Sequence, residues 1–326
     1  MKTLTLLFFG FLAGSALAAT EEQINKTFQV APGGVLVVDV DFGAIVVNTN
    51  SADSVTVNVW RRVSRGSSAK EQKFFTDNPV AFVQEGGTLT VRSRVKEDGW
   101  FRWFGGFGRR NEARYTILVP ARFDARLTTA GDGITVSNLT GAVKAGTSGG
   151  ALRFAQLTGS LEGTTSGGGI HVTDCAGPVK IQTSGGGIEV LGGSGSLNGD
   201  TSGGAITVRK FKGPVSVGTS GGGITVEEIA GAVTGDTSGG SIHAVMLSPL
   251  TGDVSLATSG GGVTVKVPAD AAFNLDAETS GGGVSCDLPV TAKGAFEHDR
   301  IKGTVNGGGP VLRLRSSGGG IHVQKL

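Results

Sequence analysis

The sequence predicts an all-β fold, a parallel β-solenoid whose turns are short repeats stacked on one another. A Thr-Ser-Gly-Gly motif returns every 18 residues, with anchors at Thr147, Thr165, Thr183, Thr201, Thr219 and Thr237. A variant begins 18 residues earlier at Thr129, steps of 21 residues lead to Thr258 and Thr279, and Ser316 follows after 37 more. A constant short period is typical of stacked repeats, in which each unit buries its apolar face against its neighbours. The expected rungs, one solenoid turn each, are therefore 18–21 residues long.

Each repeat contains the pattern of two short strands. Ile170 and Val172, for example, are apolar and flank the polar His171, and the other repeats follow the same order. This alternation predicts a strand with one buried face. In the repeats that begin at Thr129 to Thr219, a fixed glycine twelve residues after the anchor precedes a second strand, which begins near Val179 in this repeat. The Gly-Gly-Gly run after the anchor is expected to adopt positive φ angles, which β-carbons disfavour.

Parallel stacking of such units places neighbouring rungs ~4.8 Å apart. The core would then consist of columns of Ile, Val and Leu, with a ladder of Thr and Ser hydroxyls near the glycine corner. An antiparallel meander or a propeller is the alternative. It fits the period less well, because a propeller blade needs ~40 residues.

The chain divides into three segments. Residues 1–18 form a predicted signal peptide, 19–126 a β-rich N-terminal cap segment, and 127–326 the repeat solenoid. The cap segment lacks the period, but Gly43 to Val47 resembles an irregular early rung. At the other end, Gly318 to Val323 is expected to be the last rung, with an open edge beyond it. The 37 residues before Ser316 would form a longer, irregular penultimate rung.

The N-terminal residues indicate export. Lys2 precedes a mostly apolar run that ends in Ala16-Leu17-Ala18, a small-x-small cleavage site. We therefore expect a periplasmic, cell-surface or secreted protein. The formal net charge of +2 over 326 residues is too balanced to predict nucleic-acid binding. No cofactor is predicted.

Three sequence features together resemble a known family. They are the Gly-x-Ile-x-Val rungs after Thr-Ser-Gly-Gly, the strand from Tyr115 to Pro120 just before the repeats, and the closing run from Ser316 to Val323. In these features the chain is similar to the bacterial putative adhesin family, β-solenoid domains of unknown function related to adhesin-head GIN-type domains. The resemblance covers nearly all of the chain after the signal peptide. It implies an exported protein of the cell envelope with no accepted catalytic residues.

Cysteine and histidine supply no predicted site. Cys175 and Cys286 both occupy apolar core columns six repeats apart, ~29 Å along the stack. A disulfide needs α-carbons within about 7 Å, so both are predicted to be buried free thiols. His171 and His243 lie four rungs apart, ~19 Å, too far to share a zinc ion. No metal site is predicted.

Three carboxylates share one repeat position, directly before the anchor. Asp200, Asp236 and Glu278 are each expected two rungs from the next, ~10 Å apart. Carboxylates ~5.5 Å apart serve retaining glycosidases and ~6.5–9.5 Å inverting ones. The spacing therefore lies at the edge of what sugar hydrolysis uses.

One segment interrupts the repetition. It lies between 96 and 110 and holds Trp100, Phe101, Arg102, Trp103, Phe104, Phe107, Arg109 and Arg110. Exposed aromatic rings interleaved with arginine suit sugar stacking, insertion at a membrane surface or docking to a protein. The alternative is that the aromatic residues fold back over the end of the solenoid. This segment is the sequence's candidate binding site.

The sequence thus favours an exported, non-enzymatic cell-envelope protein, adhesin-like or scaffolding, that binds through extended repeat faces and the aromatic segment. Its expected partner is an envelope glycan, a membrane surface or an envelope protein. A carbohydrate-active β-helix enzyme and an envelope signalling or structural module remain alternatives. The open last rung also predicts end-to-end self-association.

Overall fold

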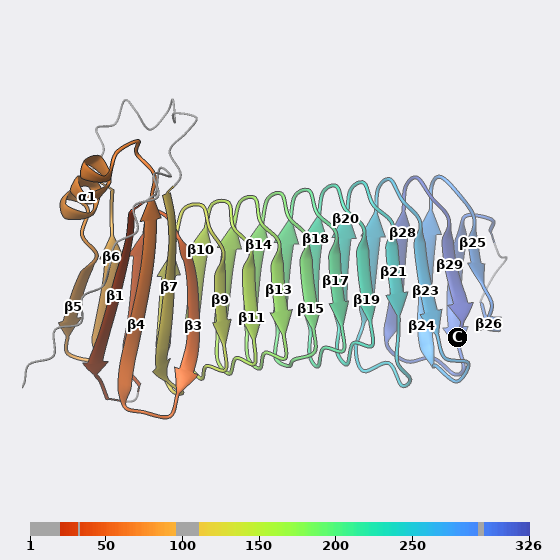
Figure 1. Ribbon diagram of the computed structural model, residues 1–326. Helices are drawn as coiled ribbons and strands as arrows, with labels where there is room; N and C mark the ends of the chain where they lie inside the picture. The colour runs from red at the N-terminus through yellow and green to blue at the C-terminus, as the bar shows by residue number, and fades with distance from the viewer. Residues whose placement is uncertain (1–19, 32, 96–110, 293–296) are drawn as a thin grey trace, which may run out of the picture.

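The computed structural model describes residues 20–31, 33–95, 111–292 and 297–326. It has two long β-sheets that face each other, one of 14 strands and one of 15, here called the first and second sheet. Figure 1 shows them as a rod of stacked rungs with a helix at the N-terminal end. The predicted all-β solenoid is confirmed.

Each repeat contributes one strand to each sheet, and successive repeats pair in parallel. In the first sheet these are β9 (Ile134–Ser137), β11 (Leu152–Ala155), β13 (Ile170–Thr173), β15 (Ile188–Leu191), β17 (Ile206–Arg209), β19 (Ile224–Glu227), β21 (Ile242–Val245) and β23 (Val263–Val267). In the second they are β8 (Asp124–Thr128), β10 (Val143–Thr147), β12 (Leu161–Thr165), β14 (Val179–Thr183), β16 (Leu197–Thr201), β18 (Val215–Thr219), β20 (Val233–Thr237) and β22 (Val254–Thr258). The alternating apolar residues of both sets face inward and form one continuous core.

The cap segment continues both sheets. Its elements are β1 (Thr20–Gln29), β2 (Val35–Val40), β3 (Ala44–Asn50), β4 (Ser54–Val63), α1 (Ser68–Asp77), β5 (Ala81–Glu85), β6 (Thr88–Ser93) and β7 (Asn111–Pro120). β3 pairs with β9, which confirms the irregular early rung. β2 and β3 lie between β6 and β7 on one side and β8 and β9 on the other. An early segment of the chain is thus enclosed by later ones.

The C-terminal end is interleaved in the same way. Its strands are β24 (Phe273–Thr279), β25 (Val284–Cys286), β26 (Val290–Thr291), β27 (Arg300–Val305), β28 (Val311–Ser316) and β29 (Ile321–Lys325). β28 lies between β22 and β24, and β29 between β23 and β25. The prediction that the rung from Gly318 to Val323, which contains β29, is the last one and has an open edge is therefore wrong. Hydrogen bonding on both sides enforces this order, which the chain sequence alone does not indicate.

Buried threonine hydroxyls join each rung to the one before it. Thr219 Oγ1 donates to the carbonyl of Gly204 at 2.9 Å and accepts from its own rung's Gly222 N–H at 3.3 Å. The same pair of bonds recurs from Thr147 to Thr258, and Ser316 takes the position in the inserted rung. The predicted hydroxyl ladder is confirmed, and its neighbouring serines face outward.

The glycine corner has a different cause from the one expected. The corner glycines, which follow the anchor threonine, do not adopt positive φ. Positive φ occurs instead at the glycine twelve residues after the anchor, as in Gly177 (φ 128°). It also occurs just after the first-sheet strands, as in Asp174 (φ 50°). The corner needs glycine because the rungs touch there. A β-carbon on Gly204 would lie 2.1 Å from the carbonyl oxygen of Gly186. No side chain fits in that space.

Replacing one ladder threonine tests the hydroxyl bonds. Thr219→Val keeps the shape but leaves the Gly204 carbonyl and the Gly222 N–H without their partner. Each unpaired buried group costs about 1–3 kcal/mol. We expect a lower urea midpoint for Thr219→Val and a smaller loss for Thr219→Ser, which keeps the hydroxyl. Equal losses in the two variants would contradict this role.

The corner contact gives a second prediction. Gly204→Ala forces its rung away from the preceding one and is expected to lower stability by several kcal/mol, as other overpacked or strained sites do. Gly146→Ala is the matched control, because a β-carbon there meets nothing within 4 Å. Thermal unfolding of the two variants should separate them clearly. A Gly204→Ala protein as stable as Gly146→Ala would show that the rungs can move apart without cost.

Candidate functional site

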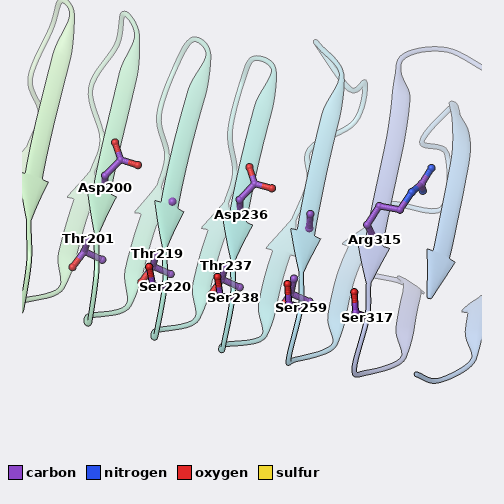
Figure 2. Close-up of a pocket in the computed structure, with 13 residues that line it drawn as sticks. Asp200, Thr201, Thr219, Ser220, Asp236, Thr237, Ser238, Ser259, Arg315 and Ser317 are labelled. Carbon is purple, nitrogen blue, oxygen red and sulfur yellow. The ribbon is translucent and has the colours of Figure 1, made fainter. Parts of the chain in front are cut away.

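The aromatic segment predicted from the sequence, with Trp100, Phe101, Arg102, Trp103, Phe104, Phe107, Arg109 and Arg110, lies outside the described residues. The structure instead presents a groove on the outer face of the second sheet. Its volume is about 500 Å³, and it runs across β16, β18, β20, β22 and β28. Asp200 and Asp236 project from the same side of the sheet above a line of threonine and serine hydroxyls at the corner (Figure 2).

The groove arises from one row of outward-facing residues, the position directly before each ladder threonine. Strand pairing aligns Asp200, Gly218, Asp236, Ala257 and Arg315 in that order along the row. Gly218 and Ala257 are too small to cover the sheet, so the surface is hollow beside each aspartate. With neighbouring strands ~4.8 Å apart, the two aspartates are separated by ~10 Å.

The prediction for Glu278 was wrong. It was expected two rungs beyond Asp236, but the inserted β28 lies between β22 and β24, so the separation is three rungs. Glu278 pairs in register with Arg315 and is not among the lining residues. The groove therefore holds two of the three predicted carboxylates.

The carboxylates of the two aspartates have no hydrogen bond or ion pair with any other described residue, whereas the Arg315 guanidinium is already engaged. Its Nη1 donates to the carbonyl of Asp276 at 2.7 Å, and its Nη2 lies 3.0 Å from Asp276 Oδ1. In Figure 2 the Arg315 side chain extends away from the aspartates. Partial desolvation in the groove raises the pKa of Asp236 above its ordinary value, because desolvation disfavours the carboxylate. The groove thus offers two carboxylates without protein partners.

This arrangement suits binding better than catalysis. Ionised carboxylates only accept hydrogen bonds, while serine hydroxyls both donate and accept. Ser220, Ser238 and Ser259 supply such hydroxyls along the corner. One metal ion cannot bridge carboxylates ~10 Å apart when each ligand must lie within about 2.6 Å of it. The described residues contain no group of three or more His, Cys, Asp or Glu side chains placed to hold a metal.

The groove was only half visible in the sequence. The shared repeat position identified Asp200 and Asp236, but it did not by itself indicate a hollow at the small residues beside them, Gly218 and Ala257. They occupy the same repeat position, so a search of that column for small residues would have found them. The predicted alignment failed only where the chain order and the spatial order differ.

Histidines and cysteines lie apart from the groove. His171 Nδ1 is 3.1 Å from Glu189 Oε2, and His322 Nδ1 is 2.9 Å from Ser285 Oγ. Both pairs of side chains lie on the exposed outer face of the first sheet. Cys175 and Cys286 are both free. Cys286 is half-buried, not buried as expected, because β25 is the terminal strand of the first sheet. Burial raises the pKa of both thiols, so neither is an activated thiolate.

A comparison with protein-family models identifies the family of this chain. The model of the family described as Toastrack DUF4097 matches residues 35–324, nearly the entire chain. The chain belongs to the Toastrack DUF4097 family. The match begins at β2, the enclosed early rung, and ends within β29, the enclosed late rung. No curated protein matches the chain.

Several solved structures are similar over most of their length. A putative cell adhesion protein from Clostridium sporogenes has 12% identity and a TM-score of 0.21, with 94% of this chain and 100% of that chain covered. A putative adhesin from Bacteroides fragilis has 10% identity and a TM-score of 0.29, covering 94% and 97%. A putative lipid binding protein from Parabacteroides distasonis has 9% identity and a TM-score of 0.34, covering 92% and 96%.

The raised pKa of Asp236 gives a prediction with a definite sign. Ionising a carboxyl group whose folded-state pKa is raised costs stability, so the cost is present at neutral pH and absent below the ordinary Asp value of ~3.9. Asp236→Asn should therefore unfold at a slightly higher urea concentration than the parent at pH 7 and at the same concentration near pH 3. A variant less stable than the parent at pH 7 would contradict the assignment.

Proposed function

We propose that this Toastrack protein is an exported, non-enzymatic, adhesin-like protein of the cell envelope that binds a hydroxyl-rich surface polymer along its second sheet. The observation that supports this proposal is the pair of unpartnered carboxylates, Asp200 and Asp236, in a groove floored by Gly218 and Ala257. A glycan offers many hydroxyl donors at a regular spacing, which matches a row of acceptors at a regular spacing. The predicted N-terminal signal peptide supports export.

The rigidity of the face supports the same function. The groove lies on sheet strands that pair on both sides, so its side chains stay in register over several rungs. A preorganised surface loses little conformational freedom on binding. Many weak contacts along a polymer then add up to useful affinity.

No helix in the described part of the chain is long and apolar enough to cross a membrane.

A carbohydrate-active enzyme is the second candidate, and the groove favours it less. Glycoside hydrolysis pairs an acid and a nucleophile or base across one bond, at most about 9.5 Å apart. Asp200 on β16 and Asp236 on β20 are separated by ~10 Å, because β18 lies between these two strands. A loss of depolymerising activity on Asp200→Ala or Asp236→Ala would overturn the non-enzymatic assignment.

A co-sedimentation assay tests the binding face. Purified protein is spun down with peptidoglycan, outer-membrane vesicles or whole cells, and the bound fraction is compared between two variants. Gly218→Arg fills the groove and places a cation between the two aspartates, whereas Gly146→Arg adds the same side chain to the same row, four rungs away.

We expect Gly218→Arg to lose at least tenfold in affinity for one of these materials and Gly146→Arg to bind as the parent does. Asp200→Asn with Asp236→Asn should also weaken binding, because amide groups replace two charged acceptors. Equal binding by all forms would remove the groove from the function. Binding by none of them, the parent included, would refute adhesion to these materials.

A further inference from the structure

The two ends of the rod are finished differently. At the C-terminal end the terminal strands are short, three residues in β25 and two in β26. At the N-terminal end the first sheet terminates in β1, an edge strand of ten residues that, among the described strands, pairs with β4 alone. Long unprotected edges are templates for pairing with another strand, and proteins usually shorten or cover them.

The hydrogen-bond pattern shows which groups of β1 face outward. Val30 N–H donates to the carbonyl of Asp53 at 3.1 Å, in continuation of the β1–β4 register. Antiparallel ladders alternate, so even-numbered residues direct their backbone groups towards β4 and odd-numbered ones away from it. The carbonyl of Gln29 agrees, because it accepts from Gln84 Nε2 of β5 instead. Glu21, Gln23, Asn25 and Thr27 therefore present four N–H and four C=O groups with no partner among the described residues.

We propose that β1 is the interface between two copies of this chain, which pair antiparallel through these outward groups. The four residues are centred on Ile24, so a two-fold axis through Ile24 pairs Glu21 with Thr27 and Gln23 with Asn25 of the second copy. This register satisfies all eight outward groups of each chain at once. It makes an isologous dimer, in which the same surface serves both partners, and joins the two first sheets into one.

The side chains support this register. Even-numbered residues of β1 face the end of the core, where Ile24 and Phe28 pack and Phe28 stacks on Phe82 of β5 at 5.9 Å. The two-fold axis places Ile24 beside its own copy and Glu22 opposite Lys26. The paired charges are therefore of opposite sign, which is favourable across strands. A shift by two residues in either direction loses this match.

The proposed register is also compatible with the contacts that Glu22 and Lys26 make within their own chain. Glu22 Oε2 accepts from Arg61 Nε at 2.7 Å, and Lys26 Nζ lies 4.7 Å from the centre of the Phe82 ring. Both side chains are thus held over the end of the rod, where the second copy would meet them.

Disulfide trapping tests the register directly. In a Cys286→Ser background, Ile24→Cys places two thiols across the axis, at a non-hydrogen-bonded pair with α-carbons about 4.5 Å apart, within disulfide range. Gln29→Cys is the control, because its two copies would be roughly 34 Å apart at ~3.4 Å per residue. We expect oxidation to give a covalent dimer of Ile24→Cys and none of Gln29→Cys. Equal crosslinking of both, or of neither, would overturn the proposed register.

Sedimentation velocity tests the dimer without crosslinking. The parent should sediment at twice the chain mass, and Asn25→Pro should sediment as a monomer, because proline removes an outward N–H that makes no internal bond. Asn25→Thr keeps that N–H and should remain dimeric, and thermal unfolding checks that all three are folded. A folded Asn25→Pro dimer would place the interface elsewhere. A parent that is monomeric at every concentration would refute self-pairing and leave the edge to a strand of another protein.

Discussion

Close contact between the backbones of successive rungs is the constraint on which this structure depends. At the corner, the backbone of each repeat lies directly against the carbonyl of the one before, where a β-carbon on Gly168, Gly186 or Gly204 would come within about 2 Å of it. The threonine hydroxyl beside that contact bonds to both rungs. Glycine and threonine thus act together: one permits the approach, and the other pairs buried backbone groups that it would leave unsatisfied.

This constraint also explains the binding surface. Because every rung is in register with its neighbours, a residue at one repeat position forms a straight row along the rod. Asp200, Gly218 and Asp236 need no loop or local adjustment to form a groove, since the sheet itself aligns them. Function in such a fold can change by substitution in an outward row while the inward columns continue to hold the stack.

The interleaved ends solve a problem that stacking creates. A solenoid with a simple first and last rung could fray from either end, because each terminal rung has one neighbour only. Here the β2–β3 and β28–β29 rungs have hydrogen-bonded neighbours on both sides. The strands β28 and β29 near the C-terminus therefore lie inside the stack, with other strands on both sides. Among the described strands, β1 has the long edge where a strand can be added to the first sheet at the N-terminal end.

The sequence by itself determined the repeat architecture, because period and alternation are local properties of the chain. It identified the inward columns, the threonine ladder and the row that contains Asp200 and Asp236. It did not reveal β1 or α1, since the polar run from Thr20 to Gln29 and the helix starting at Ser68 have weak periodicity and are stabilised by packing on the cap. Only the tertiary structure decided that the rung after Ser316 lies inside the stack, that Glu278 is three rungs from Asp236, and that the corner glycines avoid a collision. These facts depend on which strands pair, and pairing between distant segments is set by the contacts of the whole molecule.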